Sequence, residues 1–457
     1  MGHAHGPLRM SRFPALISMS LRLTPVQTRP RKRGMNDPMR VLIVSDSYPP
    51  LPDGVAQSTA ALLAGLTEIG HQAAVVAPSH RNTANDSPRV HRVRSVPAVI
   101  ADYPLSLITP RGFRPLGHRF RPDVVHIQTL APLGFAAAVY CRRYGVPAVL
   151  SWHTDVIEYR TAHRALNFAI PALHGLWNWR ERPGRTAAEV GAVAAKSLAG
   201  RDVTPEHVRM LDSAVGFFDE VIVPSRKCLL RPPLHETDRP AAVIPTAVAG
   251  DVPMTAADLP AYQAAQAKLD PARTTIAFVG RPSPEKGLED LFEALQRFVL
   301  PAHPRIQLAV IGSYRGDERY RRLATEMGLE DTVRFLGALP NSVVRALLRD
   351  CALLAHPSLT ETQGIVLTEA ALAGIPAIVM DTDLGETVRH GETGIVAETL
   401  ESFGHGITGL LSDEPLRQKL GDVAREQALA YTPAVFAGRV AEVYRSALAA
   451  KRPGTAR

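Results

Sequence analysis

The sequence is poor in cysteine and lacks long apolar runs, and both absences narrow the class of protein. Only three cysteines occur in 457 residues, at Cys141, Cys228 and Cys351, and none forms a Cys-x-x-Cys pair. This spacing indicates neither a zinc site nor a disulfide framework, and it favours buried free thiols in a reducing compartment. No apolar run approaches the ~20 residues that a membrane-spanning helix requires. We therefore expect a cytoplasmic protein.

Acidic residues are scarce at the beginning of the chain. Residues 1–40 carry eight Lys or Arg and one acidic residue, whereas residues 246–457 carry 22 basic and 26 acidic residues. The net charge of +8 belongs mostly to the N-terminal segment, so it does not indicate a nucleic-acid partner. Residues 1–38 lack the apolar segment of a signal peptide, and we interpret them as a disordered basic extension.

Short apolar runs alternate with helix-like stretches in two consecutive series, and this alternation predicts the fold. Such runs are typical of strands buried on both faces, and their alternation with helices indicates parallel sheets. Because 457 residues exceed one hydrophobic core, we predict an α/β protein with two Rossmann-like, doubly wound parallel-sheet domains that face a cleft. The expected strands are 40–46, 73–77, 124–127, 147–152 and 221–223, then 274–279, 306–311, 333–336, 352–356 and 377–380.

Changes in composition suggest where these domains begin and end. The first domain is predicted at 39–245, and a helical insertion at about 156–216 interrupts its strand–helix rhythm. Residues 246–272 are rich in Pro, Ala, Asp and Gly, which indicates a linker. The second domain is predicted at 273–432, and an amphipathic final helix follows at 433–450.

Charged residues follow the first strand of the second domain. Gly280 and Arg281 come directly after the run 274–279, and Lys286 stands where the next helix is expected to begin. The carboxyl end of a strand followed by a helix N-terminus is a ready anion site. Arg281 offers a guanidinium fork for phosphate oxygens and Lys286 offers a point charge. Taken alone, charged residues at a helix start are equally consistent with a solvated surface.

Two glutamates eight positions apart form a second candidate group. Glu361 lies in a loop after the run 352–356, and Glu369 lies inside the helix that Gly364 is expected to open. A helix carboxylate can accept hydrogen bonds from the paired hydroxyls of a ribose, and one in the loop can reach a sugar. A single glutamate in a helix would be interpreted as solvated surface.

Loops of the first domain are expected to face the same cleft. Gly54, between the first strand and its helix, lets backbone amides approach a diphosphate closely, although an ordinary turn explains it nearly as well. His153 follows the run 147–152 and either positions a ligand or serves the structure. Trp177 and Trp179 lie in the helical insertion, where aromatic side chains suit ligand binding or core packing equally.

Together these residues resemble the retaining, GT-B-type group 1 nucleotide-sugar glycosyltransferases with the Glu-x7-Glu motif. The resemblance spans about residues 40–450 and is more specific in the second domain. It implies transfer of glucose, mannose or N-acetylglucosamine to an acceptor hydroxyl by front-face attack, and a final helix that crosses back to the first domain. The matching positions are Asp53-Gly54-Val55, His153-Thr154, Gly280-Arg281, Glu285-Lys286-Gly287, Pro357-Ser358, Glu361, Gly364, Glu369-Ala370, Gly374 and Pro376.

The resemblance also implies roles for individual residues. Arg281 and Lys286 would bind the donor diphosphate and stabilise the leaving group, and Glu361 would contact the transferred hexose. His153 would lie beside the reacting centre, and Glu369 would hold the ribose. The remaining donor-binding positions are Gly54, Gly280 and Gly364, and we assign acceptor contacts to Asp155, Trp177 and Trp179.

The resemblance implies no cofactor beyond the donor, which is a UDP-, GDP- or ADP-sugar. Asp381 and Asp383 form an Asp-x-Asp pattern that holds a metal in other glycosyltransferases. No ligand cluster accompanies it, so we attribute the pattern to chance and expect no metal. Thr362 and Gln363 replace the Gly-Phe that is commoner in the family, in a run that looks more like glycolipid-forming members.

The acceptor is left open between two classes. A membrane lipid is favoured because nine arginines lie between Arg89 and Arg143 against two aspartates. Such a surface would allow peripheral contact with an anionic membrane. A small soluble acceptor, such as an aminocyclitol or another secondary metabolite, is the alternative. Two other functions compete: a nucleotide-sugar epimerase on the same fold, and a non-catalytic scaffold that would have no need of the phosphate-binding residues.

Overall fold

The computed structural model divides into Met1–Asp37 and Pro38–Arg457, and the fold described below is that of the second unit. The predicted basic extension at 1–38 lies almost wholly outside the described residues, as does Trp179. The described residues are 37–51, 53–81, 86–96, 104–162, 166–178, 183–236, 241–248, 253–314 and 317–451.

The first half of this unit is built on a seven-stranded sheet whose paired strands all run parallel. The strand order is β3-β2-β1-β6-β7-β8-β9. A separate antiparallel pair joins β4 (Ser95–Val96) to β5 (Leu105–Ser106). The strands of the large sheet are β1 (Arg40–Val44), β2 (Gln72–Pro78), β3 (Val90–Val93), β6 (Val124–Ile127), β7 (Ala148–Ser151), β8 (Glu220–Val223) and β9 (Ala241–Val243).

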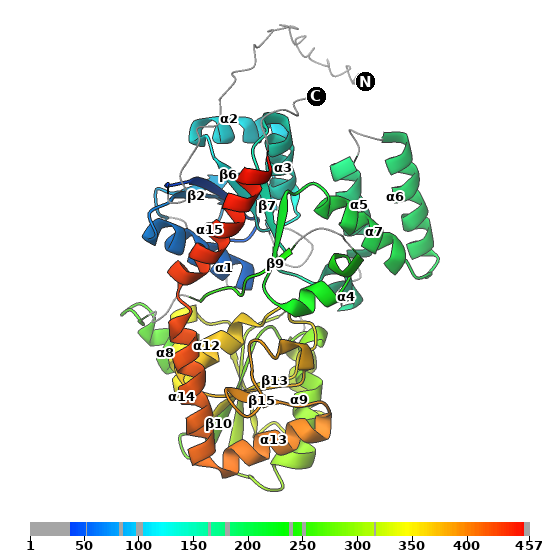
Figure 1. The fold of residues 1–457 in the computed structure, drawn as a ribbon. Coiled ribbons are helices and arrows are strands. Elements are labelled where there is room, and N and C mark those ends of the chain that lie inside the picture. The colour runs from blue at the N-terminus through cyan, green and yellow to red at the C-terminus, as the bar shows by residue number, and fades with distance from the viewer. Residues whose placement is uncertain are drawn as a thin grey trace, which may run out of the picture. The chain divides into compact units, whose positions relative to one another are not determined.

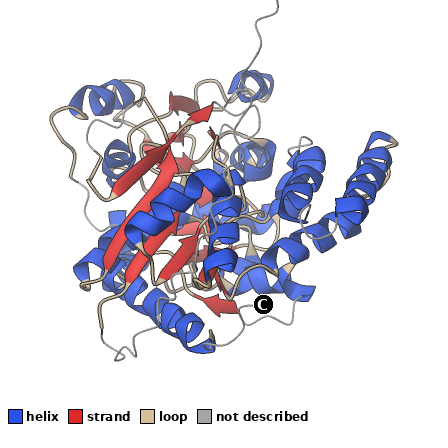
Figure 2. Cartoon of the chain, turned by 90° about the horizontal axis from the view of Figure 1, so that it is seen from above, coloured by secondary structure: helices blue, strands red, loops and turns tan. Residues whose placement is uncertain are grey.

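The second half repeats this plan with a six-stranded parallel sheet in the order β12-β11-β10-β13-β14-β15. The two sheets confirm the predicted fold class, two Rossmann-like units of doubly wound topology, and helices surround the strands (Figure 2). The strands are β10 (Thr274–Val279), β11 (Ile306–Ile311), β12 (Val333–Gly337), β13 (Leu353–His356), β14 (Ala377–Val379) and β15 (Gly394–Val396).

Helices connect the strands in both halves. Helix α8 lies inside the segment predicted to be a linker, where Ala265 packs into the core of the second sheet. The helices are α1 (Gly54–Glu68), α2 (Pro110–Phe120), α3 (Pro132–Tyr144), α8 (Leu259–Gln266), α9 (Leu288–Ala294), α10 (Asp317–Glu326), α11 (Asn341–Arg349), α12 (Ile365–Ala373), α13 (Leu400–Ser412) and α14 (Glu414–Ala430).

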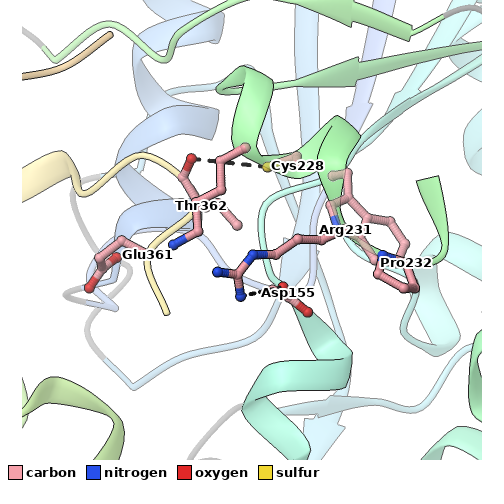
Figure 3. A pocket seen from close by; sticks show the side chains of 8 residues that line it. Asp155, Cys228, Arg231, Pro232, Glu361 and Thr362 are labelled. Carbon is pink, nitrogen blue, oxygen red and sulfur yellow. Dashed lines mark hydrogen bonds and ion pairs between the residues drawn. The ribbon is translucent and has the colours of Figure 1, made fainter. Parts of the chain in front are cut away.

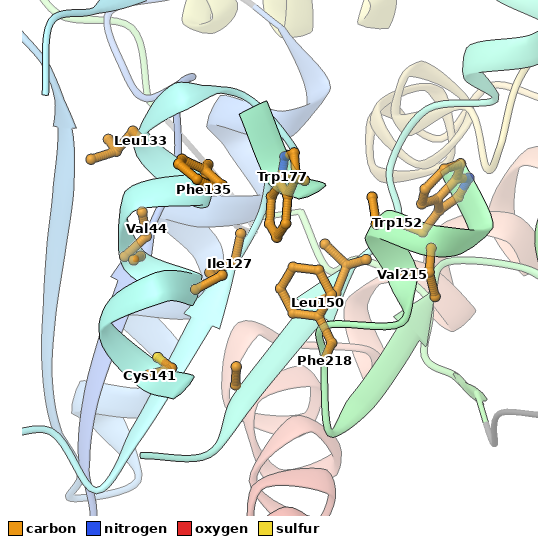
Figure 4. Close-up of a cluster of buried hydrophobic side chains, with 14 of the residues drawn as sticks. Val44, Ile127, Leu133, Phe135, Cys141, Leu150, Trp152, Trp177, Val215 and Phe218 are labelled. Carbon is orange, nitrogen blue, oxygen red and sulfur yellow. The ribbon is translucent and has the colours of Figure 1, made fainter. Parts of the chain in front are cut away.

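The insertion between β7 and β8 consists of α4 (Val156–Ala162), α5 (Leu166–Asn178), α6 (Pro183–Leu198) and α7 (Thr204–Val215). Trp177 lies at the end of α5 and is buried in the core of the first sheet (Figure 4). Its ring is 5.2 Å from that of Phe135 and 5.1 Å from that of Phe217. The prediction that Trp177 contacts the acceptor is therefore corrected, because the ring is part of the core.

The final helix, α15 (Pro433–Ala450), packs against α1 and the first sheet (Figure 1). Phe436 and Val440 are buried in that contact. Tyr444 Oη lies 2.6 Å from His126 Nδ1, and the other ring nitrogen of His126 lies 2.8 Å from Ser151 Oγ. The last helix is thus attached to the first sheet by apolar and polar contacts. Among the described helices, none combines the length and apolar character needed to cross a membrane.

The strand order reverses once in each sheet, and these points locate the site. In the first sheet the reversal lies between β1 and β6, and in the second it lies between β10 and β13. Ligands of open α/β sheets bind outside the carboxyl ends of the strands at such switch points. Ligand-binding residues are therefore expected in the loops that follow these strands.

Candidate functional site

The loop after β10 carries the two predicted phosphate-binding cations. It begins at Gly280, whose φ of +153° suits glycine. Lys286 ends a short 3-10 helix, η3 (Pro284–Lys286), and Gly287 follows with φ +67° before α9 begins at Leu288. The sequence pattern predicted that Lys286 stands at the start of this helix. In the structure Lys286 precedes α9, which begins two residues later. Helix α4 of the first half contacts η3, so this loop lies where the halves meet.

Lys286 and Glu361 form an ion pair between Nζ and Oε1. The pair joins the loop after β10 to the loop after β13, and both side chains are mostly buried. His356, the last residue of β13, places Nε2 3.5 Å from the same carboxylate oxygen. The second switch point thus holds a carboxylate between a lysine and an imidazole.

This environment fixes the charge of Glu361. Burial alone would raise the pKa of Glu361, but the charge of Lys286 and the neighbouring His356 imidazole outweigh it and hold the pKa well below its usual range. The carboxylate is therefore ionised at neutral pH and cannot serve as a general acid. It can accept hydrogen bonds from sugar hydroxyls.

Arg281 lies beside a second buried carboxylate. Its Nη2 is 3.9 Å from Oε1 of Glu285, and that oxygen also accepts a 2.7 Å hydrogen bond from Ser283 Oγ. In the first half, burial raises the pKa of Asp53, and the charge of Arg281 acts in the opposite direction. Arg281 therefore lies within electrostatic reach of the N-terminus of α1.

Gly54 begins α1 and lies close to the start of α12. A Cβ atom at Gly54 would lie 3.1 Å from Cδ1 of Ile365, the first residue of α12. Asp53 caps α1 by accepting a 2.9 Å hydrogen bond from the amide of Ala56. Two helix N-termini, one from each half, therefore lie close together where the halves meet, and helix N-termini favour anions.

Glu369 lies within α12 and is buried. Its Oε1 is 3.9 Å from Nε of Arg345 in α11. Burial raises the pKa of Glu369, while Arg345 and hydrogen bonds from Asn341 and Gln57 act in the opposite direction. Because Gln57 belongs to α1, Glu369 also lies where the halves meet. Its predicted contact with a ribose remains a prediction.

His153 follows β7 at the carboxyl edge of the first sheet. Its Nε2 lies 2.6 Å from Gln128 Oε1, so Nε2 carries the ring proton and Nδ1 is left as an acceptor. Burial lowers the pKa of His153 to about 4. A ring that is neutral at pH 7 with so low a pKa is a weak base, so it suits a hydrogen bond better than proton transfer.

A pocket beside Glu361 is formed by residues of both halves: Trp152, Asp155, Lys227, Cys228, Arg231, Pro232, Glu361 and Thr362 (Figure 3). Asp155 caps α4 by accepting a hydrogen bond from the amide of Glu158. Arg231 Nη1 lies 3.8 Å from one carboxylate oxygen of each of these two residues. The predicted acceptor residue Asp155 therefore lines a pocket that reaches Glu361.

The Asp-x-Asp pattern contacts cations of the first half. Asp381 forms a buried ion pair with Lys227, and Asp383 lies 3.7 Å from Arg231. Lys227 and Arg231 were not predicted as site residues, although both lie in the segment that follows the strand 220–223. Within the described part of the chain, no three His, Cys, Asp or Glu residues gather as a metal site.

Two protein families match this chain, one in the half that contains the first sheet and one in the half that contains the second sheet. Residues 52–215 match Glycosyltransferase Family 4, and residues 263–427 match Glycosyl transferases group 1. The GDP-mannose-dependent alpha-mannosyltransferase of Mycolicibacterium smegmatis is 28% identical over 411 residues, 86% of this chain and 94% of that protein. The alpha-monoglucosyldiacylglycerol synthase of Acholeplasma laidlawii is 23% identical over 415 residues, 89% of this chain and 96% of that protein.

The solved structures support the same fold. A sucrose-phosphate synthase from Thermosynechococcus elongatus superposes with a TM-score of 0.65 at 21% identity, covering 90% of this chain and 100% of that chain. The two family matches, the relatives that extend over both halves and the paired parallel sheets agree with one another. The chain is therefore a group 1 glycosyltransferase with the GT-B fold.

Proposed function

We propose that this enzyme transfers a hexose from a nucleotide diphosphate sugar to an acceptor hydroxyl with retention of configuration. The observation that carries the proposal is the Lys286–Glu361 ion pair at the switch point of the second sheet. Arg281 and Lys286 would neutralise the departing diphosphate, and Glu361 would accept hydrogen bonds from the hexose. The cleft-facing start of α1 at Gly54 would add backbone amides.

Retention by front-face attack fits the charges of the site. A double displacement requires a carboxylate that attacks the sugar carbon, whereas the charge of Glu361 is already neutralised by Lys286. Neutral His153 is poorly suited to deprotonate the acceptor. The leaving phosphate would then take the acceptor proton, with His153 accepting a hydrogen bond at Nδ1.

The donor is tested by incubating the enzyme with GDP-mannose, UDP-glucose, UDP-N-acetylglucosamine and ADP-glucose. GDP-mannose comes first because a full-length relative is named a GDP-mannose-dependent alpha-mannosyltransferase. We expect one of these donors to give product when lipid extract is added as the source of acceptor. Because we propose no metal, EDTA should not prevent the reaction. NMR of the product should show that the anomeric configuration of the donor is retained. Inverted product would overturn the retaining mechanism, and donor conversion without acceptor would indicate the epimerase.

We place a membrane lipid ahead of a small soluble acceptor. One relative is named for a glycolipid product. On the first half, Leu105 and Leu107 are exposed just before α2, which displays exposed Arg111 and Arg114. Apolar side chains beside cations suit an anionic membrane surface, where each cation contributes about 1 kcal/mol.

Flotation with vesicles tests this surface. We expect the protein to float with phosphatidylglycerol vesicles, and not with phosphatidylcholine vesicles. Leu105→Ser/Leu107→Ser and Arg111→Gln/Arg114→Gln should each weaken binding several-fold. Leu429→Ser is the matched control, because Leu429 is an exposed leucine on α14 of the second half. Equal flotation of all variants would overturn this surface as the membrane contact, and no flotation of the wild type would favour a soluble acceptor such as an aminocyclitol.

A further inference from the structure

The loop that carries Glu361 is attached to the first half by the residue next to it. Thr362 Oγ1 donates a 2.8 Å hydrogen bond to the backbone carbonyl of His153. The carbonyl of Thr362 accepts a hydrogen bond from Ser225 Oγ. Thr362 therefore bridges from the second half to the loops that follow β7 and β8, and it lies beside Glu361 in the pocket (Figure 3).

Gln363 makes a second attachment through its side-chain amide. Its Oε1 accepts a 2.8 Å hydrogen bond from the amide of Thr246, and its Nε2 donates a 3.1 Å hydrogen bond to the carbonyl of the same residue. The Gln363 side chain is buried, and Thr246 lies between β9 and α8, where the chain passes from one half to the other. Thr387 Oγ1 donates a 3.3 Å hydrogen bond to the carbonyl of Gln363, and this contact lies within the second half.

These contacts connect the two side chains proposed to flank the reacting sugar. Lys286 holds the Glu361 carboxylate and Gln128 holds the His153 ring. Thr362 links the segments that carry those two groups, through its hydrogen bond to the carbonyl of His153. This hydrogen bond and the contacts of Gln363 with Thr246 therefore help to set the distance between Glu361 and His153, together with the Lys227–Asp381 ion pair.

We propose that Thr362 and Gln363 form an interdomain clasp that positions Glu361 against His153 for transfer. A glycine and a phenylalanine at these two positions would supply neither the hydroxyl nor the amide. The clasp residues act through their neighbours, so they are positioning residues. This inference rests on the proposed function for the roles of Glu361 and His153, whereas the clasp itself is independent of catalysis.

A positioning role separates donor binding from turnover. Arg281, Lys286 and Glu369 do not depend on the Thr362 hydroxyl, so donor affinity should be nearly unchanged without it. Transfer requires the acceptor oxygen and the sugar carbon in near-attack geometry, and a small displacement lowers kcat steeply. A cleft that closes less completely also admits water, so donor hydrolysis should rise relative to transfer.

The clasp is tested with Thr362→Val, Thr362→Ser and Gln363→Met. We expect Thr362→Val and Gln363→Met to lower kcat roughly tenfold, the effect of about 1.4 kcal/mol, while the donor Kd stays within about twofold. Thr362→Ser retains the hydroxyl and should recover most of kcat. Thr387→Val is the matched control, because it removes a hydrogen bond to the same loop from within one half.

Hydrogen exchange gives a readout that needs no activity. In the wild type the amide of Thr246 donates to Gln363 Oε1, so Gln363→Met should accelerate exchange in the peptide around Thr246 about tenfold, and Thr387→Val should not. Unchanged exchange would overturn the clasp even if the enzyme transferred sugar as proposed. Faster exchange in a protein that transferred no sugar would retain the clasp and overturn the proposed function. Weaker donor binding at unchanged kcat would make Thr362 or Gln363 a donor contact, against the proposal.

Discussion

Lys286→Met is expected to reduce kcat/KM for transfer by a factor of about 10³ or more. Removing one group that stabilises a leaving oxyanion costs about 10²–10³ in rate. This substitution also removes the partner of Glu361, and a buried carboxylate left without its cation is strongly destabilised. The two effects act on the same donor, so we expect both a lower kcat and a weaker donor Kd. Steady-state kinetics and calorimetry with the donor identified above measure them.

The same variant should change how stability depends on pH. In the wild type the pKa of Glu361 lies below its value in the unfolded chain. The ion pair therefore stabilises the fold above the unfolded pKa, and this contribution is lost as the pH falls through the folded pKa. In Lys286→Met, burial would be opposed only by the His356 imidazole, so the folded pKa of Glu361 should rise. That variant should then lose less stability on acidification than the wild type, which thermal unfolding between pH 3 and pH 7 measures.

The matched control is Lys196→Met, which breaks the Lys196–Glu206 ion pair on the surface of α6 and α7. An exposed pair contributes only about 0–1 kcal/mol. The control should therefore keep the wild-type donor affinity and the wild-type pH profile of unfolding. If Lys286→Met behaved like this control in both assays, neither the donor role of Lys286 nor its hold on Glu361 would stand.

The strands of the fold were predictable because they are buried on both faces. The runs 124–127, 274–279 and 306–311 coincide with β6, β10 and β11, since a central parallel strand must be apolar throughout. The edge strands β3, β9 and β15 were not expected. They are only three or four residues long and include partly exposed residues, so their pattern resembles that of loops.

The candidate site was predictable only where chemistry and chain position coincide. Lys286 and Glu361 each follow a strand at a switch point, so their meeting follows from the topology. Tryptophan is common both in binding sites and in hydrophobic cores, and the sequence alone cannot distinguish these two roles. In the structure Trp177 packs in the core. The clasp at Thr362 could not be foreseen, because its partners lie more than 100 residues away.

Lys227→Met is expected to cost about 3–5 kcal/mol of stability, the effect of removing one partner from a buried ion pair. Lys227 and Asp381 are both almost fully buried and join the two halves. Lys227 Nζ also donates a 2.7 Å hydrogen bond to the carbonyl of Leu359 in the loop that leads to Glu361. Its loss leaves a carboxylate and a carbonyl without their donor. Urea unfolding measures the change.

The double variant Lys227→Met/Asp381→Asn separates charge from packing. The neutral amide can still accept the 3.1 Å hydrogen bond that the amide of Asp383 gives to Asp381 Oδ1. Without a buried charge, the remaining cost is the unpaired Leu359 carbonyl, about 1–3 kcal/mol. We therefore expect the double variant to be more stable than Lys227→Met alone, with a coupling of roughly 2 kcal/mol in the double-mutant cycle.

Lys451→Met is the control for the ion pair, since Lys451 and Asp219 form a 3.1 Å pair that is about one-third exposed. It should change stability by at most about 1 kcal/mol. If the stability changes of the two single variants added up to that of the double variant, Lys227 and Asp381 would not be coupled. The Asp-x-Asp pattern could then again be interpreted as a metal site. Strong coupling would instead assign Asp381 to joining the halves, and the same variants should then lower kcat, because the loop of Glu361 would lose one of its attachments to the first half.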